Sequence, residues 1–412
     1  MENLPLEILL QIFSHCQATE LLHLTETCSY YNKIISTRKE LSEKFTIYFR
    51  HREDFFKSSQ NRKYQRLTVD NFVERIHIGA LSSIGTDIEH LEIRRWNWNL
   101  PAKLFLYIFK KCPNLKFIRF KGILFHYHLE FHESVQFRSL LDLQIMESDS
   151  RIFKIFQHSK CHRLVYDYVP TGGNLPIPDM INFLQAQDQL EDLTLSGFLA
   201  FFNAGIGRII FHDSSLSEVQ FRLKKLSIKN SPILETIHFR RFIDLHIKSL
   251  KYLEIDGTEF WDFSDYINRC TNLQELKIGK KSRQVTLSCL QPVPTVKILK
   301  IEGPVDKNFL ANFPNLKTLE ASNLRTEKDK FDEELVCNKV EDLTIVKTWL
   351  GGFFKFSKLK KLKLKNIRVM DYRIFDENSG IEELIIESCE NLEILDAEVH
   401  KKLPKLRILK RI

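Results

Sequence analysis

The stretch IEELIIESCENL, residues 381–392, constrains the fold of this chain more than any other segment. Its apolar residues stand at the first, fourth, sixth and twelfth positions, and Cys389 stands at the ninth. The alternation at Leu384 and Ile386 predicts a short strand with one buried face. A unit of this size cannot bury that face alone, so it requires neighbours of the same shape.

The chain supplies such neighbours, because the same spacing of apolar residues recurs along most of its length. Between Leu91 and Leu409 the central residue advances in 13 steps over 318 residues, a mean of about 24.5, within the roughly 20–29 of leucine-rich repeats. Clear copies begin at Ile88, Leu115, Leu140, Leu190, Leu223, Leu250, Leu273, Val296, Leu316, Val340, Leu359, Ile381 and Leu406, and weaker copies lie at Val73 and around Leu164.

The pattern resembles leucine-rich repeats of the cysteine-containing kind. Cys112 and Cys270, each three residues before the first apolar position of a copy, belong to the same pattern. The predicted fold class is therefore α/β, with a curved solenoid of about fourteen repeats over residues 67–412 and an inner parallel sheet. Most copies lack Asn or Cys at the ninth position, so we expect irregular segments on the outer side of the sheet.

Composition and charge narrow the setting of the protein. No run approaches 18 consecutive apolar residues, so no membrane-spanning helix is expected. The N-terminus carries Glu2 and Glu7 and no basic segment, unlike a signal peptide. The 8 cysteines form no C-x-x-C pair, which is typical of reduced thiols in a cytoplasmic or nuclear protein.

The net charge of +8 is concentrated in two segments. Residues 38–66 carry nine basic and four acidic residues, and residues 399–412 carry six basic residues and no acid. The rest of the chain is slightly acidic, whereas a nucleic-acid-binding protein more usually has a basic stripe over its main surface. The charge therefore does not favour binding to nucleic acid.

Residues 4–36 read as three short helices, because apolar residues recur there at helical spacing. The segment LPLEILLQIFSHCQATELLHLTETCSYYNKII resembles an F-box, with Tyr31 where that family usually has Trp. The matching positions are Leu4, Pro5, Glu7, Ile8, Leu9, Ile12, Phe13, Leu21, Leu22, Leu24, Cys28 and Tyr31. A helical cap for the solenoid is the alternative interpretation, since repeat proteins need capping units.

The resemblance implies binding to a Skp-type adaptor and, through it, to the cullin and RING subunits of a ubiquitin ligase. The apolar positions of the first helices then become the expected adaptor contacts. They are Leu4, Pro5, Ile8, Leu9, Ile12, Phe13, Leu21, Leu24 and Tyr31. We assign residues 1–37 to this F-box and residues 38–66 to a basic helical linker whose aromatic residues pack on the first repeat. An acidic partner for that linker is the alternative.

The sequence carries no recognisable catalytic pattern, such as H-E-x-x-H, G-x-S-x-G or a phosphate-binding loop. His126, His128 and His132 have a spacing that could hold zinc only if the fold brought them together with a further ligand. We therefore expect a non-catalytic subunit with no metal and no cofactor.

The proposed role is substrate receptor of an SCF-type ligase, with the client protein on the inner face of the sheet, where Arg and aromatic residues favour binding. A non-catalytic scaffold that uses its F-box for assembly or self-turnover is the alternative, and an RNA-binding repeat protein is a weaker one. The candidate client-binding residues are Arg94, Phe117, Arg119, Lys121, Tyr252, Glu254, Ile298 and Lys300.

Charge is layered in the last repeats. Residues 355–368 carry seven basic residues and no acid, residues 374–398 carry nine acids and no base, and residues 399–412 are again basic. The predicted register places Lys361, Lys363 and Lys365 beside residues 383–387, with Lys410 beyond. Opposite charges on adjacent strands stabilise a sheet, so we expect these layers to hold the end of the solenoid in register.

Overall fold

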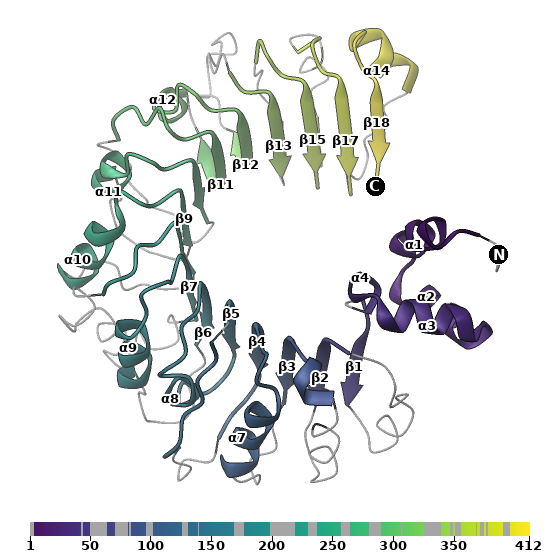
Figure 1. Cartoon of the computed structure of the whole chain (residues 1–412). Helices are drawn as coiled ribbons and strands as arrows, with labels where there is room; N and C mark the ends of the chain where they lie inside the picture. The colour runs from purple at the N-terminus through teal and green to yellow at the C-terminus, as the bar shows by residue number, and fades with distance from the viewer. Residues whose placement is uncertain are drawn as a thin grey trace. The chain divides into compact units, whose positions relative to one another are not determined.

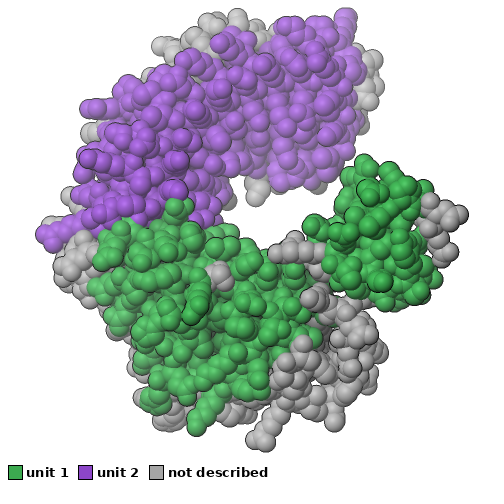
Figure 2. Space-filling view, viewed as in Figure 1, with its two compact units in different colours: residues 1–191, 218–221 green, residues 192–217, 222–412 purple. Residues whose placement is uncertain are grey.

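The structure is a computed structural model of the chain. It describes residues 4–42, 44–49, 64–70, 81, 84–95, 102–125, 131–138, 140–168, 177–197, 219–229, 237–256, 264–279, 290–305, 307–324, 339–346, 349–350, 356–367, 369–370, 375, 378–389 and 396–412. Unit 1 comprises Met1–Glu191 with Glu218–Phe221, and unit 2 comprises Asp192–Ser217 with Arg222–Ile412 (Figure 2).

The N-terminus of unit 1 is helical (Figure 1). Its helices are α1 (Leu6–His15), α2 (Ala18–Thr27), α3 (Ser29–Thr37) and α4 (Lys39–Ser42). A capping box begins α2, in which the backbone N–H of Gln17 donates to the Glu20 carboxylate at 2.7 Å. The rings of Phe13 and Tyr31 meet edge to face with centroids 5.5 Å apart. The buried apolar residues of these helices are Leu9, Phe13, Leu21, Tyr31, Ile34 and Ile35.

The helical unit extends beyond residue 37. The Lys44 ammonium donates to the carbonyls of Ser14 and Cys16 at 2.6 and 2.7 Å, so it satisfies backbone acceptors at the end of α1. The next residues form strand β1 (Thr46–Phe49), which pairs with β2 (Arg66–Asp70). The expectation of a helical linker over residues 38–66 is therefore wrong at β1, because strand pairing outweighs local helical pattern there.

Unit 1 continues as a parallel sheet in the order β1 to β6, with β3 (His90–Arg94), β4 (Phe117–Lys121), β5 (Asp142–Met146) and β6 (Arg163–Asp167). The predicted central residues align across its strands. Leu67, Leu91, Ile118, Leu143 and Leu164 are in register and buried. Residues that alternate with them point to the other side of the sheet, which we call the front face.

Figure 1 shows α7 (Ala102–Lys111), α8 (Ile152–Ile155) and α9 (Ile177–Gln185) on the back of the sheet in unit 1. A short 3-10 helix, η1 (Gly85–Asp87), precedes β3. A cluster of buried phenylalanines joins α7 and Phe156, the residue that follows α8, to β4. Phe120 lies at its centre, with ring centroids 5.7, 5.9 and 5.8 Å from those of Phe105, Phe109 and Phe156. The helices vary from 4 to 10 residues, in keeping with the irregular outer segments expected from the sequence.

Unit 2 repeats the same arrangement. Its parallel strands are β7 (Asp192–Ser196), β8 (Lys225–Lys229), β9 (Tyr252–Asp256), β10 (Glu275–Ile278), β11 (Ile298–Val305), β12 (Thr318–Leu324), β13 (Asp342–Val346), β15 (Lys361–Lys365), β17 (Glu383–Glu387) and β18 (Ile408–Arg411). The short strands β14 (Trp349–Leu350) and β16 (Val369–Met370) pair with each other. The helices are α10 (Ile237–His246), α11 (Ser264–Arg269), α12 (Lys307–Ala311) and α14 (Asp396–Lys402).

A tight turn follows several strands at the same position of the repeat. Arg95, Glu147, Asn366 and Ser388 have φ between 49° and 53°, a conformation that costs a side-chain-bearing residue about 1 kcal/mol. Gly122 and Gly197 take the same position with φ of 67° and 85°. The turn directs the backbone N–H to the next strand, as from Ser388 to the Ile412 carbonyl at 2.9 Å.

Polar side chains link adjacent repeats on the back of the sheet. The Nδ2 atoms of Asn114, Asn272 and Asn315, each before the first leucine of its repeat, donate to carbonyls of the preceding repeat at 2.7, 2.7 and 2.8 Å. Buried Gln187 accepts from the Cys161 N–H and donates to the Ser159 carbonyl. These side chains satisfy backbone groups in repeats that lack the usual Asn or Cys.

Candidate protein-interaction surfaces

The expected adaptor-binding residues separate into two groups in the structure. Leu9, Phe13, Leu21 and Tyr31 are at most 5% exposed and form the core of the helices. Leu4, Ile8 and Ile12 are 37%, 43% and 39% exposed. Ile8 and Ile12 are four residues apart and lie on one side of α1, and Leu4 lies two residues before the helix begins. Pro5 is exposed and Leu24 is half-buried. Leu22 and Tyr30 are also apolar and exposed, although they were not among the expected adaptor-binding residues.

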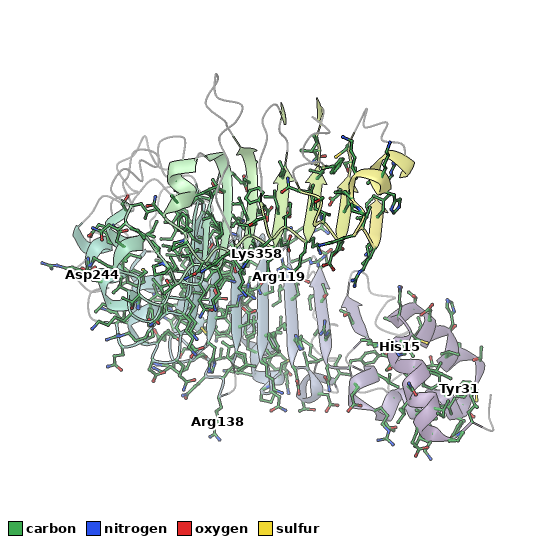
Figure 3. The ribbon with its side chains drawn as sticks, turned by 90° about the horizontal axis from the view of Figure 1, so that it is seen from above. His15, Tyr31, Arg119, Arg138, Asp244 and Lys358 are labelled. Atoms are coloured by element: carbon green, nitrogen blue, oxygen red, sulfur yellow. The ribbon has the colours of Figure 1, made fainter. Side chains whose placement is uncertain are left out.

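The first four candidate client-binding residues lie together on the front face of unit 1. Arg94 is on β3, while Phe117, Arg119 and Lys121 alternate along β4. Figure 3 shows the Arg119 side chain on this sheet. Phe117 and Arg119 line a hollow of about 370 Å³, a size typical of binding pockets, whereas Arg94 and Lys121 are not among its lining residues. Its lining residues are Thr46, Arg66, Leu67, Thr68, His90, Leu91, Glu92, Phe117, Ile118, Arg119, Asp142 and Gln144.

Sequence reasoning missed several residues of this hollow. His90 stacks on Phe117 with ring centroids 4.2 Å apart and an interplanar angle of 6°. Burial lowers the pKa of His90, and the charges of Arg66 and Lys116 lower it further, against Glu89, which raises it. The signal was available, because His90, like Phe117, directly precedes the central residue of its repeat.

The other four candidates lie on the front face of unit 2, but they are not equally accessible. Tyr252, Ile298 and Lys300 are half-exposed, whereas Glu254 is 4% exposed. The Glu254 carboxylate contacts Lys277 at 2.7 Å and Lys229 at 3.1 Å. Its expected role as an accessible client contact is therefore wrong, because neighbouring strands enclose it.

Glu254 instead forms a buried charge cluster that links β8, β9 and β10. The hydroxyls of Ser227 and Tyr252 donate to its carboxylate at 2.6 and 3.0 Å. Burial raises the pKa of Glu254, but hydrogen bonds from Lys277, Ser227 and Lys229 outweigh this and lower the pKa to about 2.

The cluster makes local stability dependent on pH. The pKa of Glu254 lies below its ordinary value of 4.5, so the cluster contributes fully above about pH 4.5 and loses its contribution as the pH falls toward 2. We expect amide exchange in β8–β10 to accelerate over that range in the wild type relative to the same strands of a Glu254→Gln variant. The change Glu254→Gln should make exchange in β8–β10 faster at pH 7 and remove this acid-dependent step, so an unchanged pH profile in that variant would contradict the assignment.

The predicted charge layers of the last repeats are confirmed. Lys361 pairs in register with Glu383, Lys365 with Glu387, and Ile385 with Lys410. The ion pairs join Lys361 to Glu383 at 3.2 Å, and Lys363 and Lys365 to Glu387 at 2.6 Å each.

These ion pairs should help to hold β17 in place. We expect Glu383→Lys with Glu387→Lys to accelerate amide exchange in β17 and β18 about two- to fivefold at low salt, because like charges would then face each other across β15 and β17. High salt should reduce the difference from wild type. The matched control is Glu341→Lys, two repeats earlier, directly before β13. The carboxylate of Glu341 lies 3.5 Å from the Lys360 ammonium, and its reversal should leave β18 unaffected. Unchanged exchange together with lost client binding would instead assign the layers to recognition.

No group of His, Cys, Asp or Glu that could hold a metal ion occurs among the described residues. His132 is exposed, while His126 and His128 fall outside that part of the chain. Burial raises the pKa of the Cys112 and Cys270 thiols to about 12, so these groups stay protonated and unreactive at neutral pH. None of the helices described is both long and apolar enough to span a lipid bilayer.

Comparison with known proteins identifies the N-terminal helices. The F-box-like family matches residues 1–47, which includes α4 and Lys44. No curated protein sequence matches the chain. Among solved structures, a leucine-rich-repeat protein of Leptospira interrogans is similar at 12% identity and a TM-score of 0.38, with 91% of this chain and 92% of that chain covered.

An internalin of Listeria monocytogenes is similar at 13% identity and a TM-score of 0.35, with 81% and 84% of the two chains covered. The in-register parallel strands, one per repeat, identify the leucine-rich repeats. F-box domains and leucine-rich repeats are typically modules of protein interaction, without catalysis of their own. Residues 1–47 are an F-box-like domain, and the chain continues from it into leucine-rich repeats, the organisation of an F-box protein with leucine-rich repeats.

Proposed function

We propose that this protein is the substrate-recognition subunit of an SCF-type cullin–RING ubiquitin ligase. The observation that carries the proposal is the F-box-like domain at residues 1–47 joined to a repeat sheet with an accessible front face. F-box domains generally bind Skp-type adaptors, and a repeat sheet of this length can contact a protein-sized client. The buried, protonated thiols fit a reducing compartment, the cytoplasm or the nucleus.

The adaptor would bind the exposed apolar residues of α1. Ile8 and Ile12 of α1, with Leu4 just before the helix, expose large apolar side chains, whereas Leu9 and Phe13 of the same helix are buried. A contiguous patch of exposed apolar side chains is characteristic of an interaction site. Leu9, Phe13, Leu21 and Tyr31 support this surface from within and do not contact the adaptor directly in this proposal.

The client would bind the front face of the repeats. The protein would then contribute proximity, since it holds the client near the active site of a recruited ubiquitin-conjugating enzyme. No residue of this chain needs to take part in the chemistry. A scaffold that uses the F-box only for assembly or for its own turnover is the second candidate function.

Affinity purification from cells distinguishes the two functions. The wild-type chain and an Ile8→Glu, Ile12→Glu variant are purified with and without proteasome inhibition, and the co-purifying proteins are quantified. For a receptor, we expect clients to accumulate on the wild-type chain when degradation is blocked and to be retained on the variant without inhibition. Partners whose recovery is unaffected by the inhibitor and by the variant would indicate a scaffold.

A further inference from the structure

The front face of β2, β3 and β4 has more positive than negative charge. Its basic side chains are Arg66, Arg94, Arg95, Arg119 and Lys121, and its acidic side chains are Asp70 and Glu92. We call these seven residues, with the His90–Phe117 stack, the basic patch. The next two strands have the opposite balance, because Asp142, Glu147 and Asp167 face only Arg163. The positive charge is therefore confined to the side of the hollow formed by β2–β4.

Both carboxylates of the basic patch are already engaged. Arg95 donates two hydrogen bonds to Asp70, at 2.9 and 2.6 Å. Arg94 donates to Glu92 at 2.8 Å, while Arg119 lies 3.7 Å from the other oxygen of Glu92. Arginine forms its strongest interactions as paired hydrogen bonds to one carboxylate, so the Asp70–Arg95 pair has little left to offer a partner.

Three cations of the patch remain available. The Arg119 guanidinium directs its donors at the Met146 sulfur, at 3.1 and 3.3 Å, and a thioether is a weak acceptor. Within the described residues, neither Arg66 nor Lys121 has an ion-pair partner, and both are exposed. A carboxylate arriving at the hollow would replace the sulfur with a much better acceptor for Arg119.

The same hollow offers an apolar contact between these cations. His90 and Phe117 stand side by side on adjacent strands, so their ring edges face the hollow, and ring edges carry partial positive charge. Arg66 precedes His90 in the same row of the sheet, and Arg119 follows Phe117 on β4. Across the strands, the row Arg66, His90 and Phe117 continues to Asp142 on β5. A segment therefore meets the cation Arg66 and the aromatic pair across the strands, and meets Arg119 and Lys121 only if it then runs along β4.

We propose that the basic patch binds an acidic segment of the client protein, with its carboxylates on Arg66, Arg119 and Lys121 and an apolar side chain beside the His90–Phe117 stack. This inference rests on the proposed function, because the segment belongs to the client of the ligase. The charge of the patch selects against basic segments, and it raises the rate of encounter with acidic ones.

The test measures binding of labelled peptides to the full-length chain by fluorescence anisotropy. The probe is the octapeptide Glu-Glu-Leu-Glu-Glu-Leu-Glu-Glu, and the matched peptides carry Gln or Lys in place of Glu. We expect the acidic peptide to bind at about 0.05 M salt and to be largely displaced at about 0.5 M, because the contacts are charged and accessible. The Gln and Lys peptides should not bind measurably.

Variants connect this binding to the patch. Arg119→Ala with Lys121→Glu should weaken binding of the acidic peptide about tenfold or more, whereas Arg119→Lys should retain most of it. Arg138→Glu is the matched control, since Arg138 is exposed in unit 1 and points away from the sheet (Figure 3). It makes the same change of charge as Lys121→Glu and should change the affinity less than about twofold.

His90 gives an independent readout, because its neighbours include charged groups on both sides. They are Arg66 on β2, Phe117 on β4 with Lys116 directly before that strand, and Glu89 directly before His90 itself. An acidic peptide in the hollow favours the protonated imidazole and so raises the pKa of His90. Affinity should therefore rise as the pH falls from about 7.5 to about 6. His90→Phe, which keeps an aromatic ring beside Phe117, should remove this dependence.

The outcomes are distinguishable from those of the proposed function when adaptor binding is measured on the same proteins. Two results would overturn the inference even where adaptor binding is intact. One is a wild-type chain that does not bind the acidic peptide. The other is equal binding of that peptide by the Arg119→Ala, Lys121→Glu variant and by the Arg138→Glu variant. A labelled ten-nucleotide oligouridylate that binds the patch in place of the peptide also overturns it. Loss of adaptor binding in the wild type would overturn the proposed function itself.

Discussion

Ile8→Glu together with Ile12→Glu is expected to abolish binding of a Skp-type adaptor while the helices of the F-box-like domain stay folded. Both side chains are about two-fifths exposed, at 43% and 39%, so their replacement does not disturb the core. Contact residues at the centre of an interface commonly contribute 2 kcal/mol or more each, and a buried carboxylate adds a desolvation cost. We expect the affinity to fall by a factor of at least about 100.

Two further variants make this experiment specific. Lys33→Glu places a carboxylate at an exposed position of α3 and should leave adaptor binding near the wild-type level. Leu9→Glu changes a residue with 0% exposure and should unfold the helices, as seen in the loss of helical circular dichroism. Wild-type affinity in the Ile8 and Ile12 variant would contradict the assignment of α1 as the adaptor surface.

Phe120→Ala is expected to destabilise unit 1 strongly. The Phe120 side chain is 0% exposed and contacts the rings of Phe105, Phe109 and Phe156. Removal of a buried phenylalanine typically costs about 3–5 kcal/mol, because it forfeits burial and leaves a cavity. Amide exchange of β3–β5 should report this loss directly, since each repeat depends on its neighbours.

Phe117→Ala is the matched control, with the same residue type on the same strand. Phe117 points to the front face, is half-exposed and stacks only on His90 among the ring contacts described. Its truncation should cost about 1 kcal/mol or less and should leave exchange in β3–β5 nearly unchanged. Equal effects of the two truncations would contradict the assignment of Phe120 to the buried face of β4 and of Phe117 to its exposed face.

The sequence was sufficient to identify the repeats and their register. Alternation within five residues decides which side chains of a strand share a face, and the interval of about 24.5 residues brings equivalent strands together. Both are local properties, so the alignment of Leu362 with Leu384 and the pairing of Lys361 with Glu383 were predicted correctly. The F-box-like domain was also recognised from local pattern, and the family comparison extends it to residue 47.

Contacts between distant residues were decided only by the tertiary structure. Pairing of β1 with β2 replaced the expected helix, because residues outside a segment determine whether it pairs as a strand. Glu254 became buried because Ser227, Lys229 and Lys277 reach it from both neighbouring strands. In α1, Leu9 and Phe13 are buried, whereas Ile8 and Ile12 are exposed. This division likewise depends on which side of the helix the other helices cover. Residue pattern determines which faces a chain can bury, but only packing in three dimensions determines which of them remain exposed to bind a partner.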